Sequence, residues 1–205
     1  MIDAAIEKRL KAYNGEQTLQ IKKQFAKGSI TRITGPSGVG KTTFLKMLAG
    51  LITPDSGIIK VDDLTWFSAE QKINLPPQQR RPGFVFQDYA LFPNMTVKAH
   101  LSYACDDAPW ISELLEIGKL DNFGSHKPDH LSGGQQQRLA ILRALAIKPK
   151  VLLMDEPFSA LDIQMKTTLI ADLRPLFTRL GTTTLIVSHN PHELDGLIND
   201  ELEIA

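Results

Sequence analysis

The chain has 205 residues, of which 42% are hydrophobic and 22% charged, a balance that is typical of a globular domain and excludes a disordered chain. Lys and Arg number 23 and Asp and Glu number 23, so the net charge is zero and no basic excess supports nonspecific nucleic-acid binding. This length suits a single domain, which we expect to span residues 1–205.

Short apolar runs alternate with helical patterns along the chain, which indicates an α/β domain with a largely parallel sheet. A helix is expected over residues 41–49, with Gly50 as its C-terminal stop. Residues 151–154 are apolar on both faces, as in a central strand that helices cover from two sides. In chain order, the expected strands are residues 29–34, 58–61, 84–86, 151–154 and 183–188.

The middle of the chain, residues 97–128, has a different character. Its apolar residues recur at helical spacing between two strand-bearing regions, so we predict a small helical insert. Together with the helix that follows, this insert reaches about residue 145. We interpret Trp110 and Leu114 as packing residues of the insert and not as part of a binding site.

A glycine-rich motif lies between the strand 29–34 and the helix 41–49. It fits the pattern G-x-x-x-x-G-K-[ST] in the strand–helix context that phosphate-binding loops require. Glycines let several backbone N–H groups converge on phosphate oxygens, and the helix N-terminus adds its positive dipole end. Lys41 would add a positive charge, and the hydroxyl of Thr42 would bind Mg²⁺. The motif consists of Gly35, Pro36, Ser37, Gly38, Val39, Gly40, Lys41 and Thr42.

Two carboxylates follow the apolar strand 151–154. Asp155 and Glu156 stand at its end, and Pro157 helps to end the strand. An unpaired buried carboxylate is costly, and a Mg²⁺ ion held together with Thr42 would be a partner for Asp155. Glu156 would then polarise a water molecule that attacks the γ-phosphate in line.

The segment 131–135 has two interpretations. Ser132 and Gln135 fit a capping box at the start of a helix, which needs no ligand. The two glycines between them, Gly133 and Gly134, each weaken a first helical turn by roughly 1 kcal/mol relative to Ala. Bare backbone at a helix N-terminus suits close phosphate contact, and a second such tip suggests a nucleotide shared between two copies of the chain.

These motifs, in this order over about residues 13–192, resemble those of the ATP-binding cassette (ABC) ATPases, the nucleotide-hydrolysing subunits of membrane transporters. The resemblance implies a P-loop NTPase core with a mostly parallel sheet, an N-terminal antiparallel β portion and a small inserted helical subdomain. It implies ATP with Mg²⁺, a homodimer in the working complex and integral membrane permease subunits as partners. Nucleic acid and a membrane span of its own are not expected. The implied location is cytoplasmic, peripheral on the inner face of the cell membrane.

The resemblance also assigns roles to residues. The phosphate loop extends to Thr43, and residues 131–135 become the signature that completes the ATP site of the opposite protomer. Glu156 becomes the catalytic carboxylate and Asp155 the magnesium ligand. The remaining assignments are Gln87 on Mg²⁺ and the attacking water, His189 on the γ-phosphate, Tyr13 stacked on adenine, and Asp162 in a loop, residues 159–162, that links the two sites across the dimer.

Two further stretches, residues 75–81 and 84–93, resemble the importer branch, with ATPases for molybdate, sulfate, polyamines and sugars. Molybdate is the first expectation for the solute, with another small solute as the alternative. Leu91, Phe92, Pro93 and Met95 would form an apolar socket for a short helix of the membrane subunit, and ordinary core packing is an equally weighted alternative. Because the sequence stops soon after His189, we expect abbreviated last elements and no regulation through the C-terminal domain common in this branch.

Two other classes are less favoured. A soluble cassette that acts on nucleic acid or the ribosome would usually carry two cassettes or a long coiled-coil insertion, and the sequence has neither. A GTPase switch would need an N-K-x-D element and a D-x-x-G at the strand end where Asp155 is instead followed by Glu156. The single cysteine, Cys105, excludes an internal disulfide. The sequence contains no run of 18 apolar residues, the length that a membrane-spanning helix would need.

Overall fold

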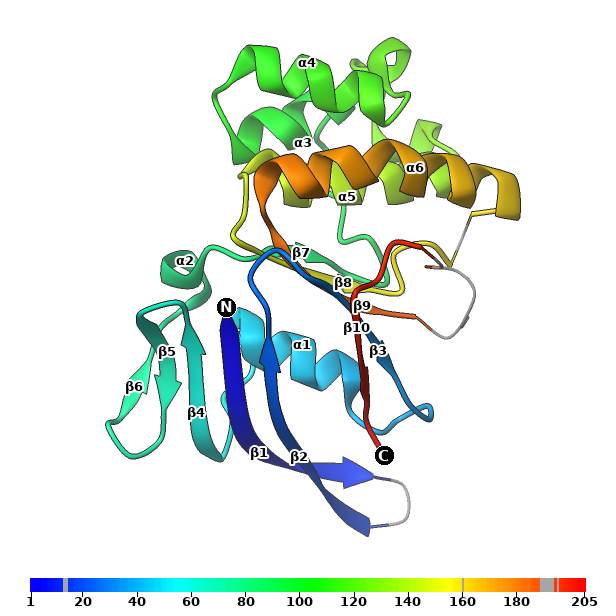
Figure 1. Ribbon diagram of the computed structural model, residues 1–205. Helices are drawn as coiled ribbons and strands as arrows, with labels where there is room; N and C mark the ends of the chain where they lie inside the picture. Colours follow the sequence, from blue (N-terminus) through cyan, green and yellow to red (C-terminus); the bar gives the residue numbers. More distant parts are fainter. Residues whose placement is uncertain (13–14, 160, 189–193, 195) are drawn as a thin grey trace.

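The structure is a computed structural model that describes residues 1–12, 15–159, 161–188, 194 and 196–205. Within these residues the strands form two five-stranded sheets (Figure 1). The antiparallel sheet has the order β2-β1-β4-β5-β6 and the parallel sheet the order β10-β3-β9-β8-β7. This architecture confirms the expected α/β class with an N-terminal antiparallel portion.

The parallel sheet carries the strands that end at the predicted site. It consists of β3 (Ile30–Thr34), β7 (Gly83–Val85), β8 (Val151–Asp155), β9 (Thr183–Val187) and β10 (Asp200–Glu203). Every residue of β8 and β9 is buried, which confirms that the apolar run 151–154 is a central strand. Since neighbouring strands run parallel, the carboxyl ends of β3, β9, β8 and β7 lie along one edge of the sheet.

The antiparallel sheet is built from β1 (Ile2–Ala12), β2 (Gly15–Phe25), β4 (Ser56–Val61), β5 (Leu64–Ser68) and β6 (Ile73–Asn74). Alternating residues of β1, among them Ile2, Ala4 and Ile6, are buried, as expected for a sheet that faces the core on one side. The predicted strand 58–61 belongs to this sheet and not to the parallel one, because its ladder pairs antiparallel with β1 and β5.

Helix α1 (Lys41–Ala49) lies between the two sheets (Figure 1). Phe44, Leu45 and Leu48 have no exposed surface, so one side of the helix forms the centre of a core that both sheets share. Gly50 ends the helix with φ 80°, the left-handed conformation that glycine adopts without strain. The bounds and the stop predicted for this helix are therefore confirmed.

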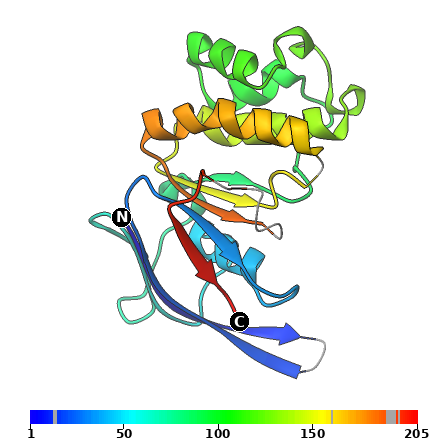
Figure 2. The ribbon, with the colours of Figure 1, turned by 45° about the vertical axis from the view of Figure 1, so that its right-hand side comes forward.

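The other face of the parallel sheet is covered by α5 (Gly133–Ala146) and α6 (Ile163–Leu180), as Figure 2 shows from a second side. Beyond them lie α3 (Val97–Ala104) and α4 (Ala108–Ile117), with the short helical turns η1 (Asp121–Phe123) and η2 (Pro128–His130). The short helix α2 (Pro77–Arg80) lies instead beside the antiparallel sheet, where Arg80 donates to Asn74 Oδ1 at 2.9 Å. Trp110 is 5% exposed and donates its indole N–H to Ala146 O at 3.1 Å, so its packing role is confirmed. Tyr103 is 71% exposed and lies outside this core.

Candidate functional site

The glycine-rich loop joins β3 to α1, and two of its glycines are required by their surroundings. Gly35 has φ 139°, and a Cβ there would lie 2.1 Å from the carbonyl oxygen of Ile204. Gly40 has φ 109°, and a Cβ there would crowd Leu10 and Leu19. Gly40 occupies the N-cap position of α1 and makes no side-chain cap, so no side chain of that residue competes for the first N–H groups of the helix.

Lys41 is only 6% exposed although it carries a positive charge. Its Nζ donates hydrogen bonds to the carbonyl oxygens of Gly35 at 2.8 Å and Pro36 at 2.7 Å. The loop thus folds around this ammonium group and holds it beside its own backbone. An anion bound in the loop would meet a positive charge that is already in place.

Asp155 is 3% exposed at the end of β8 and lies beside the first turn of α1. The hydroxyl of Thr42 donates to its Oδ2 at 2.7 Å, whereas its Oδ1 is buried and has no hydrogen-bond partner among the described residues. Burial raises the pKa of the Asp155 carboxyl, the Thr42 bond lowers it and Glu156 raises it again. A buried carboxylate oxygen without a partner fits a metal ligand.

A pocket of about 350 Å³ brings three predicted metal-site residues together: Thr42, Gln87 and Asp155. Each offers an oxygen atom, the donor type that Mg²⁺ prefers. Lys46 and Asp88 also line it and were missed, although Lys46 follows Thr42 by one helical turn, a spacing that would have placed both on one face. No group of three His, Cys, Asp or Glu side chains that could hold a metal ion occurs in the described part of the chain.

Glu156 directly follows Asp155 and turns the chain sharply. Its φ of 49° lies in the left-handed region, which non-glycine residues adopt at a cost of about 1 kcal/mol or more. Its N–H donates to Val187 O at 3.1 Å, and its own carbonyl accepts from the amide of Gln137 at 3.4 Å. Gln137 is fully buried on α5. It was not predicted from the sequence, although its polar side chain among the apolar residues of the predicted helix was a signal that could have identified it.

The signature segment caps α5. Ser132 Oγ accepts from the N–H of Gln135 at 3.3 Å, and Gln135 Oε1 accepts from the N–H of Ser132 at 2.9 Å, which confirms the capping box. A Cβ on Gly134 would lie 2.9 Å from Leu161, so close packing also favours glycine there. Asp162 accepts from Met165 N–H at 2.8 Å and caps α6. Contacts of Ser132, Gly133, Gly134, Gln135 and Asp162 with a nucleotide stay predictions.

The structure brings some predicted residues together and leaves others apart. None of residues 132–135 lines the pocket that contains Thr42, Gln87 and Asp155. Tyr13, His189 and residue 160 of the linking loop lie outside the described residues. Of the apolar socket, Leu91 packs against the core, while Phe92 is 42% exposed and lies edge-on to Tyr103 with ring centroids 5.8 Å apart.

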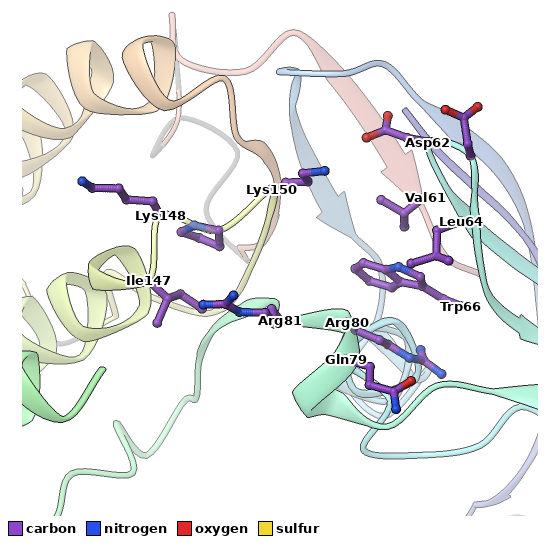
Figure 3. A pocket seen from close by; sticks show the side chains of 12 residues that line it. Val61, Asp62, Leu64, Trp66, Gln79, Arg80, Arg81, Ile147, Lys148 and Lys150 are labelled. Carbon is purple, nitrogen blue, oxygen red and sulfur yellow. The ribbon is translucent and has the colours of Figure 1, made fainter. Parts of the chain in front are cut away.

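A larger pocket of about 580 Å³ lies elsewhere, between Trp66 of the antiparallel sheet and the loop from α5 to β8 (Figure 3). Lys148 and Lys150 stand on one side and Asp62 on the other (Figure 3). Lys148 pairs with Asp107 at 2.9 Å, and Asp62 pairs with the N-terminal amine at 2.6 Å. This pocket adjoins the amino end of β8, whereas parallel α/β sheets bind ligands at carboxyl ends.

Comparisons with known proteins agree with this geometry. The family model described as ABC transporter matches residues 19–159. The sulfate/thiosulfate import ATP-binding protein CysA of Mesostigma viride is 46% identical, over 81% of this chain and 48% of the relative. The spermidine/putrescine import ATP-binding protein PotA of Vibrio vulnificus is 41% identical, over 81% of this chain and 45% of the relative. The chain thus spans about half the length of both relatives.

A solved dimeric structure of a bacterial ABC transporter cassette has a TM-score of 0.82 and 29% sequence identity, and the match covers 100% of this chain and 94% of that one. A second structure, of a dimeric post-hydrolysis state bound to ADP and Pi, has a TM-score of 0.81 at the same identity. Among the described residues, no helix combines the length and apolarity needed to cross a bilayer.

Proposed function

Because this chain belongs to the ABC transporter family, we propose that it is the ATP-binding and ATP-hydrolysing subunit of an importer. The observation that carries this proposal is the pairing of Thr42 with a buried Asp155 whose second carboxylate oxygen has no hydrogen-bond partner among the residues that the structure describes. Gln87 lines the same pocket, and the uncapped start of α1 leads into it. A phosphate loop beside an oxygen-lined metal pocket fits a magnesium nucleotide.

The chain's own residues would perform the binding steps. The N–H groups of Gly35 and residues 37–43 and the ammonium group of Lys41 would bind the β- and γ-phosphates. Thr42, Asp155 and Gln87 would hold Mg²⁺, which supplies charge neutralisation at the transferred phosphoryl group. Asp155 would need to be ionised for this, and a bound cation would oppose the effect of burial on its pKa.

Glu156 would act as the general base. It directly follows the metal-site carboxylate, and its backbone is fixed through Val187 and Gln137, so its side chain starts from a defined position. The carboxylate would orient a water molecule and accept its proton as the water attacks the γ-phosphate. His189 would contact that phosphate, as the family resemblance implies.

We further propose that the working unit is a dimer of two copies around two ATP molecules. Residues 132–135 do not line the metal pocket of their own chain, and Ser132 and Gly133 are exposed at the start of α5. The exposed helix tip of one copy would cover the nucleotide in the phosphate loop of the other. Two solved structures to which the chain is similar are dimeric.

A permease subunit would dock beside Gln87, which would place the chain in the cytoplasm on the inner face of the cell membrane. Exposed Phe92 with its neighbour Tyr103 offers an aromatic surface there, of the kind that protein interfaces favour. The named relatives import sulfate or thiosulfate and polyamines, so we propose a small charged solute, with molybdate still a prediction. Substrate contacts would lie on other subunits.

The substitution Glu156→Gln tests the assigned chemistry. It should leave MgATP affinity within about twofold of the unmodified chain and lower turnover by about 100-fold or more, since an amide cannot accept the proton. Turnover by phosphate release and affinity by equilibrium binding of ATP would be measured side by side. Glu70→Gln, at an exposed position, is the matched control and should change neither quantity. Unchanged turnover in the Glu156→Gln variant would reject the role of Glu156.

A further inference from the structure

The chain just after Gln87 adopts a conformation that needs support. Tyr89 has φ 63° and Ala90 has φ 47°, two consecutive non-glycine residues in the left-handed region. Each costs about 1–2 kcal/mol for an L-residue, so such a pair persists only where neighbouring groups hold it. Side chains from two helices, α5 and α3, hold this segment in place.

The first support is Arg143 on α5. Its Nη1 donates to Ala90 O at 2.5 Å, and its Nη2 donates to Tyr89 O at 2.9 Å. Its guanidinium carbon also lies 5.7 Å from the ring centre of Phe92. One planar, forked group therefore bonds both carbonyls of the left-handed pair through separate nitrogens and lies over the next aromatic ring, a geometry that depends on the fork that lysine lacks.

The second support is His100 on α3, which has no exposed surface. Its Nε2 accepts from the N–H of Phe92 at 2.9 Å, and its Nδ1 lies 2.8 Å from Thr96 O. Because Thr96 O can only accept, Nδ1 must carry the proton, and Nε2 must be bare to accept from Phe92. Burial lowers the pKa of His100 and so favours this neutral form. The nearby charge of Arg143 lowers the pKa further, while the bond to Thr96 raises it in part.

We propose that Arg143 and His100 are positioning residues that hold residues 89–92 and thereby set the place of Gln87 in the pocket beside Thr42 and Asp155. Arg143 stands on the helix that begins at the signature glycines, so the position of Gln87 follows the position of α5. A signature segment that moves on meeting a nucleotide would carry the Gln87 loop with it. This inference rests on the proposed function of Gln87 at the metal site.

A merely structural arginine would lower stability without acting through Gln87, and a double-mutant cycle separates the two roles. Arg143→Lys keeps the charge but replaces the planar fork, whose two nitrogens each bond one carbonyl, with a single ammonium group on a shorter side chain. In the otherwise unmodified chain it should lower kcat by about tenfold and raise the Mg²⁺ concentration needed for half-maximal turnover. In a Gln87→Ala background the same change should lower kcat by less than about twofold, because the group through which Arg143 acts is gone.

Arg179→Gln is the matched control. Arg179 also lies over an aromatic ring, 5.4 Å from Trp110, and bonds Glu113 at 2.6 Å, and neither of these interactions involves residues 89–92. It should leave kcat and the Mg²⁺ dependence unchanged. Equal loss of kcat from Arg143→Lys in both Gln87 backgrounds would overturn the positioning role.

Amide hydrogen exchange gives a readout that does not depend on catalysis. Arg143→Lys and, separately, His100→Leu should speed exchange at Phe92 by about tenfold, since the first loosens the segment and the second removes the acceptor of that N–H. Unchanged exchange in both variants would show that neither side chain holds the segment. If the unmodified chain hydrolyses no ATP, the proposed function fails, while the exchange result still decides whether the segment is held.

Discussion

The N-termini of α1 and α5 carry the two predicted phosphate contacts, and they are built in different ways. Helix α1 starts from Gly40 without a side-chain cap, and Lys41 is buried against the loop. Helix α5 starts from Ser132, and its capping box satisfies the N–H groups of Ser132 and Gln135. The first end leaves its donors for an anion, whereas the second already uses two of its N–H groups in its own capping box.

This difference indicates that the two helix ends contribute to ATP binding in different ways. The α1 end would supply most of the affinity for a single chain, because its first N–H groups are uncapped and its positive charge already lies beside them. The α5 end would contribute only when a second copy brings a nucleotide to it. Of its two side-chain bonds, the longer one from Gln135 N–H to Ser132 Oγ, at 3.3 Å, would be the easier to exchange for a phosphate oxygen.

The largest expected effect comes from Lys41→Met, which removes the charge and keeps the length of the side chain. MgATP affinity of the isolated chain should fall by about 100-fold, as expected for a lost charge-assisted hydrogen bond to phosphate. Equilibrium binding of ATP by calorimetry would measure this. Lys60→Met, at an exposed strand position, should bind ATP normally. Normal ATP affinity in the Lys41→Met variant would show that groups other than those at the N-terminus of α1 bind the nucleotide.

A smaller effect is expected from Ser132→Asp, because Asp caps a helix about as well as Ser but adds a negative charge. ATP affinity of the single chain should stay within about twofold, while turnover should fall by about tenfold through repulsion of the triphosphate. Ser132→Asn, a neutral residue that also caps, is the control and should retain most of the turnover. Equal turnover in the Asp and Asn variants would mean that no phosphate approaches α5.

The smallest expected effect is one of stability. Asp155→Asn replaces a buried carboxylate, whose pKa is raised by burial, with a neutral amide that can still accept from Thr42. Without nucleotide, the free energy of unfolding should rise by about 1 kcal/mol, or Tm by about 2–4 °C. The additional stabilisation by MgATP should be lost. A lower Tm in thermal unfolding of the nucleotide-free variant would show that the Asp155 charge is favourable without a metal.

Local signals made much of the parallel half predictable. The glycine-rich loop, the start of α1 and Gly50 define that helix by backbone chemistry alone, and β8 and β9 are apolar throughout. The antiparallel hairpin was expected only from the family resemblance, since Ala5 and Lys8 interrupt the apolar alternation of β1. Helix α6 was not predicted, because Ile163 is 83% exposed and Pro175 lies inside the helix.

The site was predictable where a motif names its residues and not where distant chain segments meet. Thr42 and Asp155 were placed together from the sequence, and Thr42 Oγ1 lies 2.7 Å from Asp155 Oδ2. The bonds of Arg143 to Tyr89 and Ala90 span 54 and 53 residues, and no local pattern signals them. The positive φ of Glu156 likewise follows from contacts with β9 and α5, which sequence periodicity does not report.

Mixing two defective chains tests most directly whether each ATP lies between α1 of one copy and α5 of the other. A dimer of Lys41→Met with Ser132→Asp has one site with both defects and one with neither, if the sites are shared. An equimolar mixture should then recover about one quarter of the unmodified turnover, because half of the dimers are mixed and each has one intact site. Turnover no higher than that of the separate variants would contradict the shared site.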